Sequence, residues 1–301
     1  MSHVSVLLEE SLAALNLRKG MTVVDGTFGF GGHSTRVAKA IGMDGRLIAF
    51  DADESVFTND KGSEHVKELE RLTAFTSVPE NFRHMSEALK RLSIERIDAA
   101  LFDLGLSSTQ LEASGRGFSF QKDEPLVMTF KKAPEETDVT AKVIVNTWSP
   151  ETISTILRGF GDERYAWRIA QGIVAARKQR EISTTFELVE IVKASTPVGY
   201  HHGKTHFATR TFQALRMAVN DELGAIEKGI EGAFTHLVKG GRIAVITFHS
   251  IEDRLVKQLF KKMVEEGSAA ALWKKPLTPG DDELMVNPRS RSAKLRAIEK
   301  M

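Results

Sequence analysis

The sequence predicts an α/β fold whose parallel sheet is interrupted by an inserted all-α domain. Over the first hundred residues, short apolar runs alternate with amphipathic helical patterns, and the alternation returns near the end of the chain. Several of these runs end in a glycine-rich turn or an acid, as strands do where doubly wound sheets bind ligands. Between residues 112 and 210 we find only helical patterns. We therefore expect an α/β domain from residues 1–111 and 211–301, and a helical domain from residues 112–210.

The expected elements of the first part follow one another in pairs. Apolar residues at helical spacing predict helices over residues 4–17, 34–41, 53–72 and 83–92. Runs of β-branched and other apolar residues predict strands over residues 22–25, 47–51, 75–78 and 97–103. Because each strand leads through a helix to the next strand, we expect right-handed crossovers and parallel pairing.

The later elements are predicted by the same patterns. Within the insert we expect helices over residues 141–148, 151–157, 163–178 and 184–194, followed by a loop at 197–204. Beyond it we expect a long helix over residues 211–237, a strand at 240–248, a helix at 251–264 and an edge strand at 293–298. Ser250 and Asp253 have the spacing of a capping box for the helix at 251–264.

Composition limits the classes of function. The chain has 301 residues and no cysteine, which excludes disulfides and a cysteine nucleophile and is typical of a cytoplasmic protein. It has neither a secretory signal nor an apolar run of about 18 residues that would span a membrane. His201, His202 and His206 lack carboxylates at ligand spacing, so no metal site is predicted. The net charge is +1, but basic residues gather from residue 287 to the end, which indicates a phosphate-bearing partner or a solvated tail.

The predicted site is organised around one stretch, Val23-Val24-Asp25-Gly26-Thr27-Phe28-Gly29-Phe30-Gly31-Gly32-His33-Ser34. A strand, a glycine-rich turn and a helix start follow one another here, so the backbone can approach a ligand and the helix offers unpaired N–H groups. The next strand ends on Asp51, where nucleotide-binding folds place an acid on a ribose hydroxyl. The glycine spacing departs from the dinucleotide pattern and is closer to the loop of S-adenosylmethionine-dependent methyltransferases. A turn required only for packing is the alternative.

Further candidates follow other predicted strands. Phe82 comes after the third strand, where its ring would either stack on an adenine or belong to the core. Asp103 ends the fourth strand, and His249 follows the first strand after the insert. Because the carboxyl ends of parallel strands share one edge of a sheet, we expect Gly31, Asp51, Phe82 and Asp103 to converge there.

Seven motifs occur in order along the chain. They are His3-Val4-x-Val6-Leu7-Leu8-x-Glu10, Asp25-Gly26-Thr27-Phe28-Gly29-x-Gly31-Gly32-His33-Ser34, Asp103-Leu104-Gly105-Leu106-Ser107-Ser108-x-Gln110-Leu111, Arg116-Gly117-Phe118-Ser119-Phe120, Ala208-Thr209-Arg210-Thr211-Phe212-Gln213-Ala214-Leu215-Arg216, Phe248-His249-Ser250-x-Glu252-Asp253 and Asn287-Pro288-Arg289-Ser290-Arg291-Ser292-Ala293-Lys294-Leu295-Arg296. Together they resemble the RsmH (MraW) family of bacterial 16S rRNA cytosine-N4 methyltransferases over essentially the whole chain.

The resemblance implies a class I (Rossmann-like) methyltransferase sheet with an inserted helical substrate-recognition domain. It implies S-adenosylmethionine as cofactor, 16S rRNA or the small ribosomal subunit as partner, and methylation of the N4 amine of a cytidine in the decoding region. The donor-binding positions of the family correspond to Gly31, Gly32, His33, Asp51, Phe82, Asp103 and Gln110. The oligomeric state stays open, with a homodimer as one alternative.

Chemical roles follow from this reaction. The cytosine amine is a poor nucleophile, so holding it in line at about 3–3.5 Å should supply most of the acceleration. Asp103 or the Ser107-Ser108 turn would accept an amine hydrogen, and His249 is the second catalytic candidate. The base must be unstacked to react, and the base-pocket candidates are Asn220, His249 and Ser250. Candidates for contacts with RNA phosphates are Arg289, Arg291, Lys294 and Arg296.

One segment departs from the family. Where the family usually has Pro-Leu-Asp-Met-Arg-Met, this chain has Pro125-Leu126-Val127-Met128-Thr129-Phe130, so an acid and a base are both lost. Losing both partners of a charge pair can be nearly neutral for folding. If the pair served the substrate, activity would have changed, so a catalytically impaired donor- or RNA-binding member of the family is the alternative. A nicotinamide oxidoreductase is disfavoured by the glycine spacing.

Overall fold

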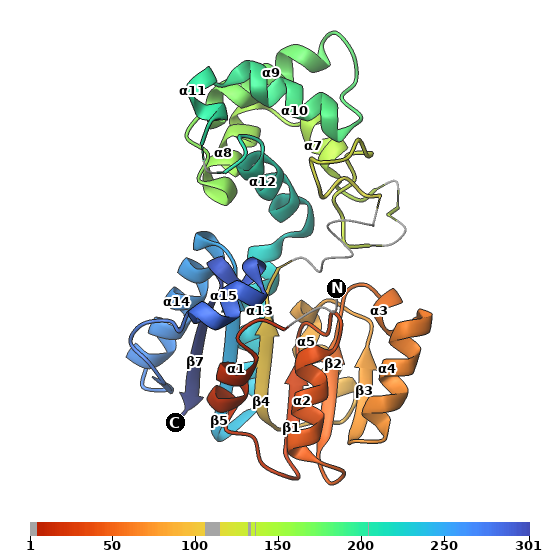
Figure 1. Ribbon diagram of the computed structural model, residues 1–301, viewed down its shortest axis with the longest axis vertical. Coiled ribbons are helices and arrows are strands. Elements are labelled where there is room, and N and C mark those ends of the chain that lie inside the picture. Colours follow the sequence, from red (N-terminus) through yellow and green to blue (C-terminus); the bar gives the residue numbers. More distant parts are fainter. Residues whose placement is uncertain (1–4, 106–114, 132–133, 136, 204) are drawn as a thin grey trace. The chain divides into compact units, whose positions relative to one another are not determined.

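The computed structural model describes residues 5–105, 115–131, 134–135, 137–203 and 205–301 (Figure 1). The chain divides into two compact units, of which the first consists of Met1–Gly105 with Leu223–Met301 and the second of Leu106–Glu222. Within the described ranges, every helix is too short or too polar to span a lipid bilayer.

The first unit is built on a seven-stranded sheet. Its strands are β1 (Thr22–Asp25), β2 (Arg46–Phe50), β3 (Ala74–Val78), β4 (Ile97–Asp103), β5 (Leu237–Thr247), β6 (Ala269–Ala271) and β7 (Lys294–Lys300). They lie in the order β3-β2-β1-β4-β5-β7-β6, and only the pairings of β7 are antiparallel (Figure 1). The strand order reverses between β1 and β4, and ligands bind at such a switch point in doubly wound sheets. The predicted α/β fold is confirmed.

Helices cover both faces of this sheet. Successive residues of a strand point to opposite faces, and the strand residues are apolar on both, so each face needs a layer of helices to bury it. Val23 and Leu47, which are paired, pack in one buried cluster, whereas the next pair, Val24 and Ile48, packs in another. The first cluster is closed by α1 (Leu8–Leu15), α2 (Gly32–Ile41) and α4 (Asp60–Glu70). The second is closed by α5 (Met85–Arg91), α13 (Glu222–His236) and α14 (Ser250–Glu265).

The second unit is helical throughout its described elements, as the sequence predicts. They are α7 (Ala141–Thr147), α8 (Pro150–Gly161), α9 (Ala166–Arg177), α10 (Thr185–Ser195), α11 (Val198–His201) and α12 (Thr209–Asn220). Side-chain caps start three of them, at Thr140, Ser149 and Thr184, and the last forms a capping box with Glu187. Their apolar faces share one buried cluster.

The expected boundary at residue 211 is wrong because α12 belongs to the helical unit. Phe212 and Leu215 of this helix are buried in the cluster of α8 and α9. The single long helix expected over 211–237 is also wrong. Asp221, with φ 45°, adopts the left-handed conformation that ends a helix, so the chain forms α12 and α13 instead.

Other differences concern short elements. The helical stretch expected over 53–72 is split into α3 (Ser55–Thr58) and α4 by Asn59, whose side chain caps α4. The C-terminal strand is not an edge strand, since β7 lies between β5 and β6. Short elements that the sequence patterns did not predict are η1 (Phe82–His84), β6, α15 (Asp281–Val286), η2 (Pro288–Ser292) and α11, which lies in the stretch 197–204 expected as a loop.

Candidate active site

The predicted site residues of the first unit lie at the carboxyl ends of neighbouring strands. Asp51 directly follows β2, and Asp103 is the last residue of β4. Phe82 starts η1 after β3, and His249 follows β5. The strand order brings these ends together with the glycine-rich loop after β1 along one edge of the sheet. Gln110 and the Ser107-Ser108 turn lie outside the described residues.

Asp25 fixes the glycine-rich loop, although we assigned it no role from the sequence. Its carboxylate accepts hydrogen bonds from Ser34 Oγ at 2.7 Å and from the Thr27 amide at 3.0 Å. Burial raises the pKa of Asp25, and the hydrogen bond from Ser34 is the largest opposing effect. Asp25 thus ties the end of β1 to the first turn of α2, with the loop held between them.

The glycines of the loop serve different purposes. A Cβ at Gly31 would lie 2.8 Å from the His65 ring, and a Cβ at Gly32 would collide with the Ser5 hydroxyl. Both glycines therefore leave room for side chains of the chain itself, and the donor contact predicted for them stays a prediction. Gly29, with φ 54°, has no side-chain neighbour among the described residues within 4 Å of such a Cβ. Because its Cα is open on this side, Gly29 is the better candidate for close approach of a ligand. The Gly29-x-Gly31 motif is the feature of the sequence that could have identified Gly29.

Asp51 is oriented by two backbone amides. Its Oδ2 accepts a hydrogen bond from Gly29 at 2.9 Å, and its Oδ1 accepts one from Asp53 at 2.9 Å. Burial raises the pKa of Asp51 to about 6, while these hydrogen bonds act in the opposite direction. A carboxylate oxygen has more than one acceptor position. Asp51 can therefore still accept hydrogen bonds from ribose hydroxyls, the role predicted for it.

Asp103 has one anchored oxygen and one unpartnered oxygen. Oδ2 lies 3.5 Å from His33 Nδ1, whereas Oδ1 is buried without a hydrogen-bond partner among the described residues. His33 Nε2 lies 3.1 Å from the Val6 carbonyl, which can only accept, so Nε2 carries the hydrogen. Burial raises the pKa of Asp103 to about 6, and His33 acts in the opposite direction. An orphaned carboxylate oxygen at this edge is suited to accept a hydrogen from a ligand.

Phe82 contributes to the core of the first unit. Its ring meets Phe102 edge to face, with centroids 5.5 Å apart and an interplanar angle of 72°. On its other side it contacts α13 where Gly229 leaves room, since a Cβ there would collide with the ring. The alternative that Phe82 belongs to the core is therefore correct for part of the ring. The ring is only partly buried, and adenine stacking on its remaining surface stays a prediction.

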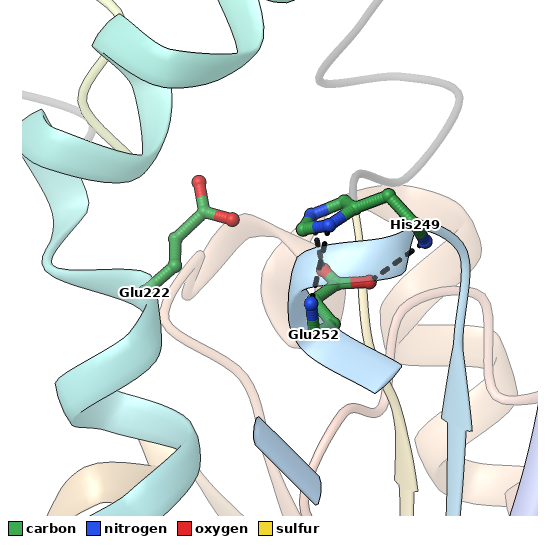
Figure 2. Close-up of side chains that lie close together, drawn as sticks. All are labelled: Glu222, His249 and Glu252. Atoms are coloured by element: carbon green, nitrogen blue, oxygen red, sulfur yellow. Dashed lines mark hydrogen bonds and ion pairs between the residues drawn. The ribbon is translucent and has the colours of Figure 1, made fainter. Parts of the chain in front are cut away.

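His249 caps α14, and the capping box assigned to Ser250 and Asp253 is wrong by one residue. The Glu252 amide donates to His249 Nδ1 at 3.3 Å, and Glu252 Oε2 accepts from the His249 amide (Figure 2). Glu252 Oε2 also accepts from the Phe248 amide at 2.9 Å. His249 Nε2 lies 3.0 Å from Glu252 Oε1 but not at hydrogen-bonding angles. Ser250 is the first residue of the helix. This geometry gives His249 a structural role beside the catalytic one predicted for it.

The four basic residues proposed for RNA phosphates differ in their surroundings. Lys294 donates to Asp253 at 3.0 Å, and Arg296, which is largely buried, donates to it at 2.6 Å. Burial acts to raise the pKa of Asp253, but the hydrogen bonds from these cations outweigh it and lower the pKa. Arg289 and Arg291 are exposed. The charges of Lys294 and Arg296 are thus balanced within the fold, and Arg291 is better placed for a phosphate.

Asn220 organises the segment in which this chain departs from the family pattern. Its amide nitrogen donates to the carbonyl oxygens of Met128 at 2.7 Å and Arg216 at 2.9 Å. Its carbonyl oxygen accepts from the Phe130 amide at 2.8 Å. All these groups belong to the helical unit. The amide of Asn220 is thus engaged within the protein, which favours a positioning role over direct contact with a base.

The residues of the first unit fit an S-adenosylmethionine molecule. Gly29 leaves open space beside the loop, and Asp51 faces it with acceptor positions for hydroxyls. These groups follow β1 and β2 and provide the kinds of contact that the donor requires. Across the switch point, the orphaned Oδ1 of Asp103 at the end of β4 is left to accept a hydrogen from the molecule that receives the methyl group.

Comparisons with known proteins agree with the motifs. The model of the MraW methylase family matches residues 1–301. A relative from Symbiobacterium thermophilum is 43% identical over 99% of this chain and 96% of its own length, and one from a Paenibacillus species is 42% identical over 99% of both. Each is named Ribosomal RNA small subunit methyltransferase H. Among solved structures, an rRNA methylase from Streptococcus thermophilus has 13% identity and a TM-score of 0.46, covering 100% of this chain and 99% of its own.

Proposed function

We propose that this chain, which belongs to the MraW methylase family, methylates the N4 amine of a cytidine in the decoding region of 16S rRNA. The chain is a methyltransferase, and S-adenosylmethionine is its methyl donor. Ribosomal RNA of the small subunit is the substrate class named for its relatives. With the small ribosomal subunit as partner, the enzyme works in the cytoplasm. The choice of the cytosine N4 amine and of the decoding region rests on the seven motifs.

The observation that carries this proposal is the orphaned oxygen of Asp103. Oδ1 is buried, has no partner among the described residues, and lies at the end of the strand next to the glycine-rich loop. An unsatisfied buried carboxylate oxygen is costly unless a ligand supplies a hydrogen. A cytosine N4 amine carries two hydrogens, and one of them must leave when the methyl group arrives.

The protein contributes orientation and a hydrogen acceptor to this reaction. S-adenosylmethionine supplies an electrophilic methyl group when bound. Asp51 orients the donor through its ribose hydroxyls, and Gly29 leaves space for it beside the loop. Asp103 Oδ1 accepts a hydrogen bond from the attacking amine, which increases electron density on the nitrogen, and takes the proton as the new N–C bond forms. His33 Nδ1 lies 3.5 Å from Oδ2, on the other side of the carboxylate from the atom that takes the proton.

The alternative of an impaired enzyme rests on Val127 and Thr129. Thr129 is buried in the helical unit, where its Oγ1 accepts a hydrogen bond from the Lys131 amide at 3.3 Å. Asp51 and Asp103, the donor-side groups, are both retained and belong to the other unit. This favours the active enzyme.

The test is transfer of a labelled methyl group from S-adenosylmethionine to small ribosomal subunits that lack the modification. The RNA is then digested and its nucleosides are separated. Label in N4-methylcytidine, in an RNA fragment from the decoding region, is the expected result. Label in another nucleoside would overturn the acceptor, and donor binding without transfer would favour the impaired alternative. Absence of donor binding would overturn the assignment of Gly29 and Asp51.

A further inference from the structure

A hollow of about 240 Å³ opens at the carboxyl end of β5 in the first unit. His249 and Ser250 line it from the start of α14, and Arg291, Ser292 and Lys294 line it from the stretch that leads into β7, together with Thr278. His249 and Ser250 are predicted base-pocket residues, and Arg291 and Lys294 are predicted phosphate contacts. The fold brings both groups to one hollow.

The chemistry of the lining selects an anion. Two cations, three hydroxyls and an imidazole line the hollow, and its described lining contains no carboxylate. Asp253 balances the charge of Lys294 at 3.0 Å. Arg291 is exposed and makes no ion pair among the described residues, so its guanidinium is available to a ligand. Arginine is well suited to bind phosphate because its donors form a planar fork.

The size of the hollow limits what it can hold. Pockets for whole drug-sized ligands usually measure about 300–1,000 Å³, and a water molecule takes about 30 Å³ of liquid. At about 240 Å³, the hollow suits a phosphate group with part of its sugar rather than a complete methyl donor.

The position of the hollow relates it to Asp103. In the sheet Asp103 pairs with Ile246, and His249 comes three residues later. With about 4.8 Å between strands and about 3.3 Å per residue, the hollow begins roughly 10 Å from the end of β4. A nucleotide next to a base held at Asp103 can bridge this separation.

We propose that this hollow binds the backbone phosphate of a nucleotide flanking the target cytidine, with Arg291 as its cation. The inference rests on the proposed function, because that function makes RNA the phosphate-bearing partner. Lys294 serves a different purpose, since its charge is balanced by Asp253, which also accepts from Arg296.

The first test measures binding of unmodified small ribosomal subunits by the Arg291→Gln variant between about 50 and about 200 mM salt. Loss of one phosphate contact should lower the slope of log affinity against log salt by about 0.7–0.9. A defect of about tenfold at the lower salt should therefore shrink to about threefold at the higher salt. Arg96→Gln is the matched control, because Arg96 is an exposed arginine just before β4, at the opposite edge of the sheet.

A second pair of variants tests the hollow without removing the arginine. Ser292 is exposed, so Ser292→Glu should fold normally and place a carboxylate where the phosphate binds. We expect Ser292→Glu to weaken subunit binding as much as Arg291→Gln, and the neutral Ser292→Gln to weaken it much less. The KM for S-adenosylmethionine should stay unchanged in all these variants.

Several results would overturn the inference. If affinity depends on salt with the same slope in wild type and in Arg291→Gln, then Arg291 does not bind a phosphate. This conclusion would hold even if the wild type methylates RNA. A change confined to the KM of the donor would assign the hollow to the donor instead. Displacement of subunits by inorganic phosphate at constant ionic strength would make it a site for a free anion. If the wild type binds subunits with the expected slope but transfers no methyl group, the proposed function fails while the phosphate site stands.

Discussion

Replacing Asp103 by asparagine should reduce kcat by about 10²–10⁴, the usual contribution of a general base. Asparagine keeps the shape of the side chain but cannot take the amine proton. Burial raises the pKa of Asp103 to about 6, so the wild-type carboxyl is largely ionised at neutral pH. Between about pH 7 and about pH 5 the ionised fraction falls about tenfold, and wild-type kcat should fall with it.

The assay is methyl transfer to unmodified small subunits at saturating donor, with kcat measured across this pH range. Asp51→Asn is the control, because the pKa of Asp51 is also raised to about 6 by burial. Asp51→Asn should raise the KM of the donor, and its kcat should still fall between about pH 7 and about pH 5 as in the wild type. In Asp103→Asn, kcat should no longer depend on pH over this range. An Asp103→Asn enzyme with wild-type kcat and an unchanged pH profile would refute the role of Asp103 as acceptor.

The same pKa shift predicts an effect on stability with a definite sign. An aspartate whose pKa is raised in the folded state binds more protons there than in the unfolded state. The free energy of unfolding therefore falls as pH rises from about 4 to about 6, by up to about 3 kcal/mol for a shift of about 2 units. Asp103→Asn should accordingly be more stable than wild type at neutral pH and not at about pH 4. Urea unfolding at both pH values measures this difference, and a less stable variant at neutral pH would contradict it.

Three further predictions test the packing around the site. Gly32→Ala should impair folding through its collision with the Ser5 hydroxyl. Adding Ser5→Gly to this variant should restore both the melting temperature and donor binding. If only the melting temperature recovers, Gly32 contacts the donor directly. His249→Ala should lose a helix cap at a cost of about 1 kcal/mol, and His249→Ser should recover both stability and kcat, unless the imidazole itself contacts substrate. Arg216→Met should lower the free energy of unfolding by about 3–5 kcal/mol, because it removes both hydrogen bonds to the largely buried Glu222 carboxylate, at 2.7 and 2.9 Å. Urea unfolding of the double variant Arg216→Met/Glu222→Met should recover most of this loss, and an equal loss would show that the pair contributes by packing.

The fold could be predicted wherever its determinants are local. The runs ending at Asp25 and Asp103 form strands with the expected bounds, because β-branched and apolar residues are flanked there by turn residues. The break between α12 and α13 was missed because the apolar pattern continues through Asp221, whose left-handed backbone has no signature in that pattern. The position of β7 inside the sheet was missed because it depends on pairing with β6, a three-residue strand that the sequence pattern did not predict.

The site residues could likewise be predicted where their determinants are local, and not where they depend on distant parts of the chain. Asp51 and Asp103 could be predicted because an acid at the end of a buried strand is visible in sequence. The cap of α14 was shifted by one residue because His249 and Glu252 share the spacing of Ser250 and Asp253, and histidine is not among the common caps. That Asp253 balances two cations of the C-terminal strand was beyond prediction, since the partners lie about forty residues apart.

The altered segment of the helical unit shows why two charges could be lost there together. Met128, a buried residue with φ 55°, lies between Val127 and Thr129, and its carbonyl is bound by Asn220. The backbone on both sides is also held, since the Val127 carbonyl accepts from the Ala141 amide and the Phe130 amide donates to Asn220. The conformation of the segment is therefore maintained by hydrogen bonds to its backbone, from Asn220 and from the Arg116 guanidinium to the Phe130 carbonyl, and not by charges at positions 127 and 129. Removal of one charge would leave its partner exposed to a desolvation cost, whereas removal of both leaves these bonds intact. Any effect of the change on activity must then act through the RNA rather than through folding of the helical unit.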